Sequence, residues 1–131
     1  MIRLKTDPFP SNDEFELLFV AAWGEGKPDY AGKVLPRSLV HIGAFADDRL
    51  VGFVNVAWDG DVHAFLLDTS VHPEFQRQGI ATMLVRRAAE LAKERGAEWL
   101  HVDYDAHLEG FYRGCGFRPT GAGLIDLKSR P

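Results

Sequence analysis

The spacing of apolar positions predicts two main helices. After Ser11 the apolar residues recur at helical spacing, with polar side chains able to cap free backbone N–H groups, and Gly24 stops the helix. A longer helix is predicted over residues 79–95, where one apolar stripe opposes charged residues and Gly96 fits a left-handed cap. Two shorter helices are predicted over residues 30–35 and 108–115.

Between these helices the apolar pattern changes to that of strands. Two apolar runs meet at the predicted turn Asp47-Asp48. A second turn, Asp59-Gly60-Asp61, leads into a third run in which both alternating sets of positions are apolar. We expect this third strand to be central and covered on both faces. The long helix joins it to a further strand, which implies a parallel pair. The predicted strands are residues 2–4, 39–46, 49–58, 62–71, 97–104 and 124–127.

Length and composition restrict the class of protein. A chain of 131 residues fits a single domain, residues 1–131, of mixed α/β (α+β) class with a mostly antiparallel central sheet and flanking helices. Its net charge of -4 argues against nucleic acid as a partner. No apolar run has the length of a signal peptide or membrane span, and Cys115 is the one cysteine. We therefore expect a cytoplasmic protein that does not bind membranes.

A glycine motif stands at the start of the long helix. It reads Gln76-Arg77-Gln78-Gly79-Ile80-Ala81 and is followed by Thr82. The first turn of a helix has backbone N–H groups without partners and a partial positive charge, and together they hold phosphate. Gly79 lets the backbone approach a ligand, and Ala81 leaves room for a diphosphate. A plain capped helix start is the alternative.

A second motif lies near the C-terminal end and reads Phe111-Tyr112-Arg113-Gly114-Cys115-Gly116-Phe117. With the glycine motif at this separation, the chain resembles the GNAT superfamily of acetyltransferases over residues 40–120. It departs from the family at Asp105, where many members have Asn, and at Leu108, where many have Ala. Few residues follow Phe117, so the usual last strands must be short or partly missing.

The resemblance implies that acetyl-coenzyme A is the cosubstrate. Its pyrophosphate would lie on Gln76, Arg77, Gln78, Gly79, Ile80, Ala81 and Thr82. In the family the fourth and fifth strands splay apart, so the backbone of Ser70 and Val71 would meet the pantetheine arm. Tyr112 would contact the coenzyme and act as the general acid for the leaving thiolate.

An acceptor amine needs a base and a binding site. Asp68 stands in an apolar strand, where a carboxylate is costly unless it is paired or faces a cleft, so it is the candidate base. The alternatives are a hydrogen-bonded structural aspartate at a β-bulge, a base at His101, Asp103 or Asp105, and proton transfer through water without a dedicated base. Trp23, Asp103 and Tyr104 are the candidate acceptor-binding residues, and an acidic, aromatic cleft would suit a cationic amine.

Several other residues receive structural interpretations. Histidines and aspartates near residue 103 lack a recognised ligand spacing, and thioester acetyl transfer needs no metal, so no metal is expected. Cys115 is interpreted as a small buried residue rather than a nucleophile. His41, His63 and His72 are expected to face solvent, and Trp99 is expected in the core.

The resemblance implies transfer of an acetyl group from acetyl-coenzyme A to a primary amine by direct attack in a ternary complex. A small-molecule amine is the favoured acceptor. Two alternatives stay open: an acetyltransferase acting on protein lysine or N-terminal amines, and a non-catalytic acyl-coenzyme A binding or sensing module. The resemblance also allows a homodimer.

Overall fold

The computed structural model describes residues 1–128 and contains a mixed five-stranded sheet. The strand order is β1-β2-β3-β4-β5, with antiparallel neighbours except for the parallel pair β4 and β5. This confirms the predicted mixed sheet and its parallel pair. The strands are β1 (Ile2–Thr6), β2 (Ser38–Ala46), β3 (Arg49–Trp58), β4 (His63–Val71) and β5 (Trp99–His101).

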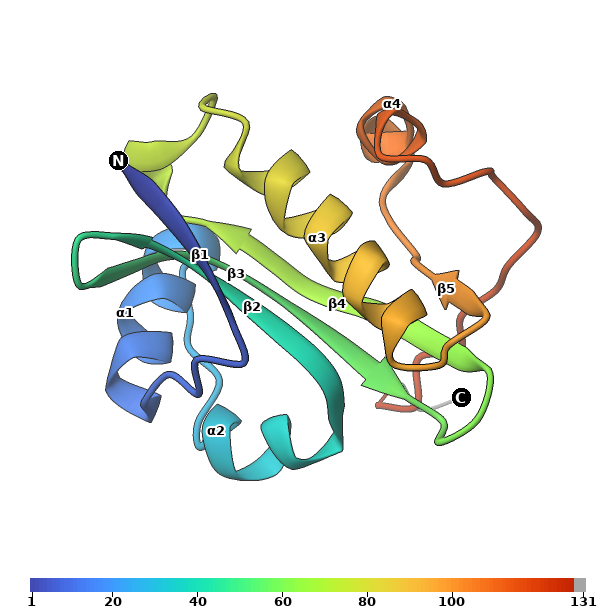
Figure 1. Cartoon of the computed structure of the whole chain (residues 1–131), viewed down its shortest axis with the longest axis horizontal. Coiled ribbons are helices and arrows are strands. Elements are labelled where there is room, and N and C mark those ends of the chain that lie inside the picture. Colours follow the sequence, from blue (N-terminus) through green and yellow to red (C-terminus); the bar gives the residue numbers. More distant parts are fainter. Residues whose placement is uncertain (129–131) are drawn as a thin grey trace.

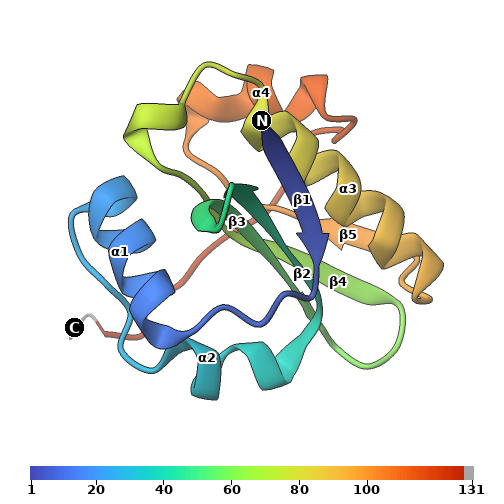
Figure 2. The same cartoon turned by 60° about the vertical axis from the view of Figure 1, so that its left-hand side comes forward.

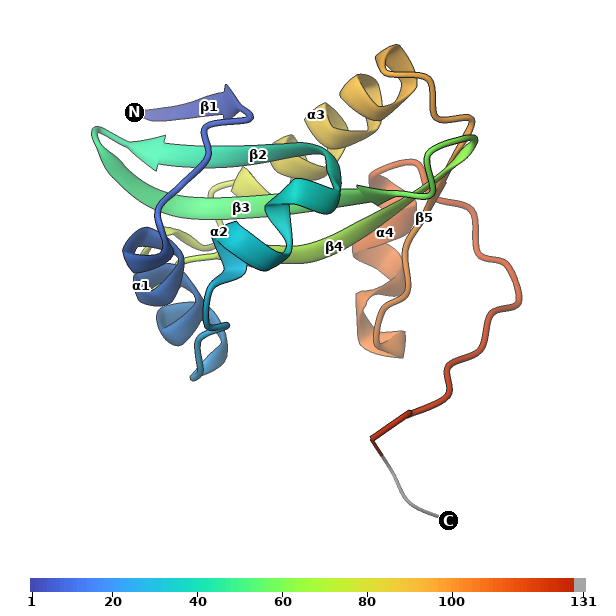
Figure 3. The same cartoon turned by 90° about the horizontal axis from the view of Figure 1, so that it is seen from below.

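Helices cover both faces of the sheet (Figures 1 and 2). Helix α3 (Ile80–Glu94) crosses one face, and α1 (Asn12–Trp23) and α2 (Tyr30–Lys33) lie on the other, as Figure 3 shows from below. Helix α4 (Glu109–Gly114) follows β5 at the edge of the sheet. Short 3-10 turns are η1 (Leu35–Arg37), η2 (Pro73–Phe75) and η3 (Ala106–Leu108).

The predicted start and end of the first helix are confirmed by its capping. The Ser11 hydroxyl accepts from the Glu14 N–H at 3.1 Å, and the Glu14 carboxylate accepts from the Ser11 N–H at 3.0 Å. This capping box satisfies two donors that the helix itself leaves free. Gly24, with φ of 85°, ends the helix in the left-handed conformation.

The sheet separates two apolar clusters. On the α3 side, Leu84 and Val85 pack with strand residues such as Ile42 and Val54. On the other side, aromatic rings from α1, α2 and β3 pack together, with Phe15 and Phe53 only 4.8 Å apart between centroids. Burial of both faces holds the sheet between its helices.

Strands β4 and β5 splay apart. They pair at three positions, from His63 opposite Trp99 to Phe65 opposite His101. The predicted strand over residues 97–104 is therefore longer than β5. Beyond His101 the chain turns toward α4 (Figure 3), so residues 66–71 of β4 have no strand of the described chain on that edge.

A β-bulge interrupts β4 next to this free edge. Phe53 pairs with Ser70 and Asn55 with Leu67, so two steps along β3 oppose three along β4. Asp68 adopts φ of 59°, the left-handed conformation that aspartate tolerates better than most residues. The bulge places Asp68 and Thr69 at the point where β4 loses its neighbour.

Three predictions of strand and burial are wrong. Residues 124–127 form no strand, and Leu124, Ile125 and Leu127 are exposed, because no described strand lies beside them. Trp99 is 56% exposed rather than in the core. Phe65 and Leu67 are also exposed, so β4 is not covered along both faces.

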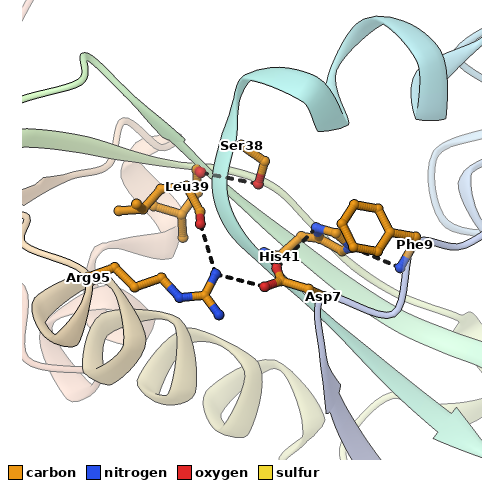
Figure 4. A network of polar contacts seen from close by, with 7 residues as sticks. Asp7, Phe9, Ser38, Leu39, His41 and Arg95 are labelled. Carbon is orange, nitrogen blue, oxygen red and sulfur yellow. Dashed lines mark hydrogen bonds and ion pairs between the residues drawn. The ribbon is translucent and has the colours of Figure 1, made fainter.

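His41 is buried, which corrects its expected exposure to solvent. Figure 4 shows that its Nε2 accepts from the Phe9 N–H at 3.0 Å and that its backbone N–H donates to Asp7. Arg95 donates to Asp7 at 2.7 Å and to the Leu39 carbonyl at 2.9 Å. The network joins the β1–α1 connection, β2 and the end of α3. His63 and His72 are partly buried.

Candidate active site

A cleft of about 470 Å³ opens between the free edge of β4, the start of α3 and helix α4. Splaying of β4 from β5 creates this space, because the two strands separate after Phe65 and His101. Its lining residues are Thr69, Ser70, Val71, Phe75, Gln76, Arg77, Gly79, Ile80, Ala81, Thr82, Leu108, Phe111 and Tyr112.

The cleft brings together the residues predicted to bind the cosubstrate, except Gln78, which is exposed and does not line it. Sequence reasoning missed Thr69, Phe75, Leu108 and Phe111 as lining residues. Phe111 carried a signal, because it precedes Tyr112 in the second motif, and Leu108 lies four residues before Tyr112. Phe75 and Thr69 carried none, since their position depends on the η2 turn and the bulge.

The start of α3 is not capped by any side chain of the described chain. Gly79 is the N-cap residue with φ of 78°, and a Cβ added to it would meet no described atom within 4 Å. No side chain of residues 1–128 therefore blocks this helix start, and an anion site here stays a prediction beside the alternative of a plain helix start. The first-turn N–H groups of residues 80–82 face a cleft in which they can bind an anion.

The Gln76 side chain holds the preceding loop against β4. Its Nε2 donates to the Val71 carbonyl at 3.3 Å, which closes the loop between the strand and the helix. Arg77 has φ of 65°, an uncommon conformation for its residue type, and its side chain is exposed beside the cleft. The loop thus places Gln76 and Arg77 in the lining of the cleft, next to the start of α3.

Tyr112 lies at the other side of the cleft, 8% exposed. Its ring stacks on Tyr104 at 4.9 Å and meets Phe117 edge-on at 5.7 Å. Burial raises the pKa of the Tyr112 phenol above its usual value, an effect that the nearby Thr69 side chain partly offsets. The phenol therefore keeps its proton at neutral pH and is available as a hydrogen-bond or proton donor.

Asp68 points to the α1–α2 side of the bulge. The Tyr30 hydroxyl donates to its Oδ2 at 2.7 Å, and Lys27 Nζ lies 3.1 Å from its Oδ1. Both features of the structural alternative, a β-bulge and hydrogen bonds, are present. Asp68 does not line the cleft, and a catalytic role for it stays a prediction.

Tyr30 is a fixed donor to Asp68. Its side chain is buried among aromatic rings, and burial, then the Asp68 charge, raise the pKa of its phenol far above the usual value. The buried Asn55 amide lies beside the Tyr30 hydroxyl and lowers this pKa, which partly offsets the other two effects. The Asn55 side chain makes no hydrogen bond of good geometry within residues 1–128.

The predicted acceptor residues form two groups. Trp23 and Asp68 meet through Lys27, whose Nζ lies 5.5 Å from the centre of the Trp23 ring. Tyr104 stacks on Tyr112, and the negative charge of Asp103 contributes to the raised pKa of the Tyr112 phenol. Sequence reasoning missed Lys27, because no local pattern connects this loop residue with Asp68.

Other candidate chemistry finds no support in the described residues. Burial raises the pKa of the Cys115 thiol, which keeps it protonated and poorly nucleophilic. Among residues 1–128 no group of three or more His, Cys, Asp or Glu side chains could hold a metal ion. In the same part of the chain, no helix has the length and apolar character needed to cross a membrane.

The chain belongs to the acetyltransferase (GNAT) family, whose family model matches residues 2–117. Its fold is similar to that of a GNAT-family acetyltransferase from Streptococcus pneumoniae, with a TM-score of 0.80 and 28% identity. That similarity covers 97% of this chain and 99% of the other. The match confirms both the resemblance and the fold inferred from the two motifs.

Two curated relatives are similar to parts of the chain. A ycf52-like N-acetyltransferase of Prochlorococcus marinus is 26% identical over 106 residues, which are 78% of this chain. A streptothricin acetyltransferase of Streptomyces lavendulae is 36% identical over 89 residues, which are 65% of this chain. The matches span 59% and 46% of the relatives' own lengths.

Proposed function

We propose that this domain is an N-acetyltransferase that moves the acetyl group of acetyl-coenzyme A to a primary amine of a small molecule. The observation that carries the proposal is the single cleft in which an uncapped helix start, a free strand edge and a buried tyrosine meet. These three features supply, in turn, an anion site, a backbone edge and a proton donor.

The start of α3 would hold the pyrophosphate. Its free N–H groups and the helix dipole provide roughly half a positive charge without any metal. The open space at Gly79 and the small side chain of Ala81 leave the backbone accessible to the phosphate oxygens. The residues therefore fit a diphosphate group, with Arg77 and Thr82 available from the same lining.

The free edge of β4 would hold the pantetheine arm. Ser70 and Val71 line the cleft on the part of β4 that β5 does not pair, so an extended ligand can take the place of the missing strand. A backbone N–H of β4 would polarise the thioester carbonyl as the amine attacks it. Tyr112 would then protonate the thiolate when the carbon–sulfur bond breaks.

The acceptor would enter from the α1–α2 side of the bulge. Asp68 and Trp23 offer a carboxylate and an aromatic face there, which is the chemistry that binds an alkylammonium group. Asp103 and Tyr104 would bound the acceptor beside Tyr112. Similarity to a streptothricin acetyltransferase supports a small-molecule acceptor.

Calorimetric titration with acetyl-coenzyme A, followed by thiol release with a panel of small amines, amino acids and antibiotics, tests the proposal. We expect binding in the absence of metal and release with one class of amine. Absence of binding would overturn the proposal entirely. Binding without release would favour a sensing module, and release with lysine peptides alone would replace the small molecule by a protein acceptor.

A further inference from the structure

Lys27 lies where a cationic substrate would be expected. Its Nζ lies 3.1 Å from Asp68 Oδ1 and 5.5 Å from the centre of the Trp23 ring. A carboxylate on one side and an aromatic face on another form the environment that recognises an alkylammonium ion. The chain thus supplies its own alkylammonium group at this place.

The groups around Lys27 are fixed independently of it. The Trp23 ring stacks on Phe19 with centroids 4.7 Å apart and planes within 4°. Asp68 is fixed by the bulge and by the Tyr30 hydroxyl, which donates to Oδ2. The site therefore keeps its shape if the Lys27 side chain moves out.

Lys27 itself is weakly held. Its side chain is 46% exposed and comes from the connection between α1 and α2, whereas the Asp68 side chain is 18% exposed. Exposed ion pairs contribute little stability, because water solvates the free ammonium group well. A long, flexible lysine side chain can leave Asp68 without any change in the backbone.

Simultaneous binding of two ammonium groups is unfavourable. Tyr30 already uses Asp68 Oδ2, so Lys27 and an incoming ammonium group would compete for Oδ1. Two positive charges at one oxygen also repel each other. Displacement of Lys27 is therefore the route by which a cationic acceptor reaches the carboxylate.

We infer that Trp23 and Asp68, which the Tyr30 hydroxyl holds in place, form the binding site for the ammonium group of the acceptor, and that Lys27 occupies this site until an acceptor displaces it. The inference rests on the proposed function and specifies its substrate class: an alkylammonium compound. A cation must therefore bind Asp68 and Trp23 more favourably than Lys27 does. A neutral compound lacks the charge that displaces Lys27.

Titration with n-butylammonium chloride at constant ionic strength tests this inference without acetyl-coenzyme A. The indole N–H resonance of Trp23 reports binding, and that of Trp58, whose N–H donates to the Asp61 carbonyl, is an internal reference. Lys27→Met should bind the probe about two- to fivefold more tightly than the unchanged protein. Lys27→Ala should show the same gain, which excludes an effect of the methionine side chain.

Two controls separate displacement from a general change in charge. Lys33→Met removes a positive charge from the exposed end of α2 and should leave the affinity unchanged. In an Asp68→Asn background, Lys27→Met should bring no gain, because the shared carboxylate is gone. Equal or weaker binding by both Lys27 variants would overturn the inference. Failure of thiol release would instead overturn the proposed function, so the two failures are distinct.

Discussion

The hydroxyl of Tyr30 donates to Asp68 Oδ2 across 2.7 Å and ties α2 to the bulge of β4. A hydrogen bond to a charged group contributes about 1.5–3 kcal/mol, so Tyr30→Phe should lower the free energy of unfolding by about that amount. The ring remains among Phe15, Phe19 and Phe53, so the loss measures the hydroxyl rather than packing. Urea unfolding at pH 7 measures it.

Asp68→Asn is the matched variant for this bond. Asparagine tolerates the left-handed backbone at residue 68 and still offers an oxygen to the Tyr30 hydroxyl, but without charge. Its stability should fall between those of the unchanged protein and Tyr30→Phe. A loss larger than that of Tyr30→Phe would show that the carboxylate stabilises the fold mainly through another partner.

Tyr112→Phe should separate binding from turnover. The phenol lies in the cleft with a raised pKa and keeps its proton, whereas the ring alone packs on Tyr104. Loss of a general acid lowers turnover by about 100-fold, so kcat should fall while the affinity for coenzyme A stays unchanged. Steady-state thiol release and calorimetry measure the two quantities. Unchanged kcat would remove Tyr112 from the mechanism.

Local sequence signals predicted those parts of the fold whose cause is local. The capping box at Ser11 and Glu14 and the apolar stripe of α3 depend on neighbouring residues, and the structure has both. The two motifs likewise contain many of the residues that line the cleft, although Gln78 lies outside it and Thr69 and Phe75 belong to neither motif. Each motif spans one end of a helix and the loop beside it, and the connection between a strand and its crossover helix has few alternatives.

Features that depend on distant partners were not predictable in this way. Lys27 and Asp68 are 41 residues apart, and Arg95 and Asp7 are 88 apart, so no periodicity connects them. Trp99 was expected in the core because tryptophan is large and apolar. It lies instead on β5, an outer strand of the sheet, and is exposed there.

Gly79→Ala should weaken binding of coenzyme A. The residue has φ of 78° and its added Cβ meets open space in the cleft, so the change strains the backbone and places a methyl group where a phosphate would lie. Loss of one N–H contact to a phosphate, about 1.5 kcal/mol, corresponds to an affinity loss of about tenfold. Calorimetric titration measures this loss.

Gly96→Ala is the matched control for Gly79→Ala. Gly96 has φ of 105° and likewise open space around an added Cβ, but it lies at the opposite end of α3. Both substitutions should cost about 1 kcal/mol of stability through backbone strain. Affinity for coenzyme A should fall for Gly79→Ala alone, and an equal fall in both variants would contradict the anion site at the start of α3.

The buried His41 should make stability depend on pH. Burial lowers the pKa of its imidazole below the ordinary value of 6.5, and the Arg95 charge adds to this while Asp7 opposes it. Its Nε2 accepts from the Phe9 N–H, so the native protein holds the neutral ring. A protonated ring would lose this acceptor, which couples the β1–α1 connection to the protonation state.

The sign of this pH dependence follows from which state, folded or unfolded, binds the proton at higher pH. As pH falls below about 6.5, the unfolded chain protonates His41 while the folded chain does not, so the free energy of unfolding decreases. The stabilising contribution of the neutral His41 ring is complete above about pH 6.5 and is lost as the pH falls toward the lower pKa of the folded state. The slope for one group cannot exceed about 1.4 kcal/mol per pH unit.

Urea unfolding between pH 8 and 5 measures this slope. His41→Gln should remove the slope, whereas His107→Gln, at an exposed site, should retain it. A slope that persists in His41→Gln would assign the pH dependence to other groups.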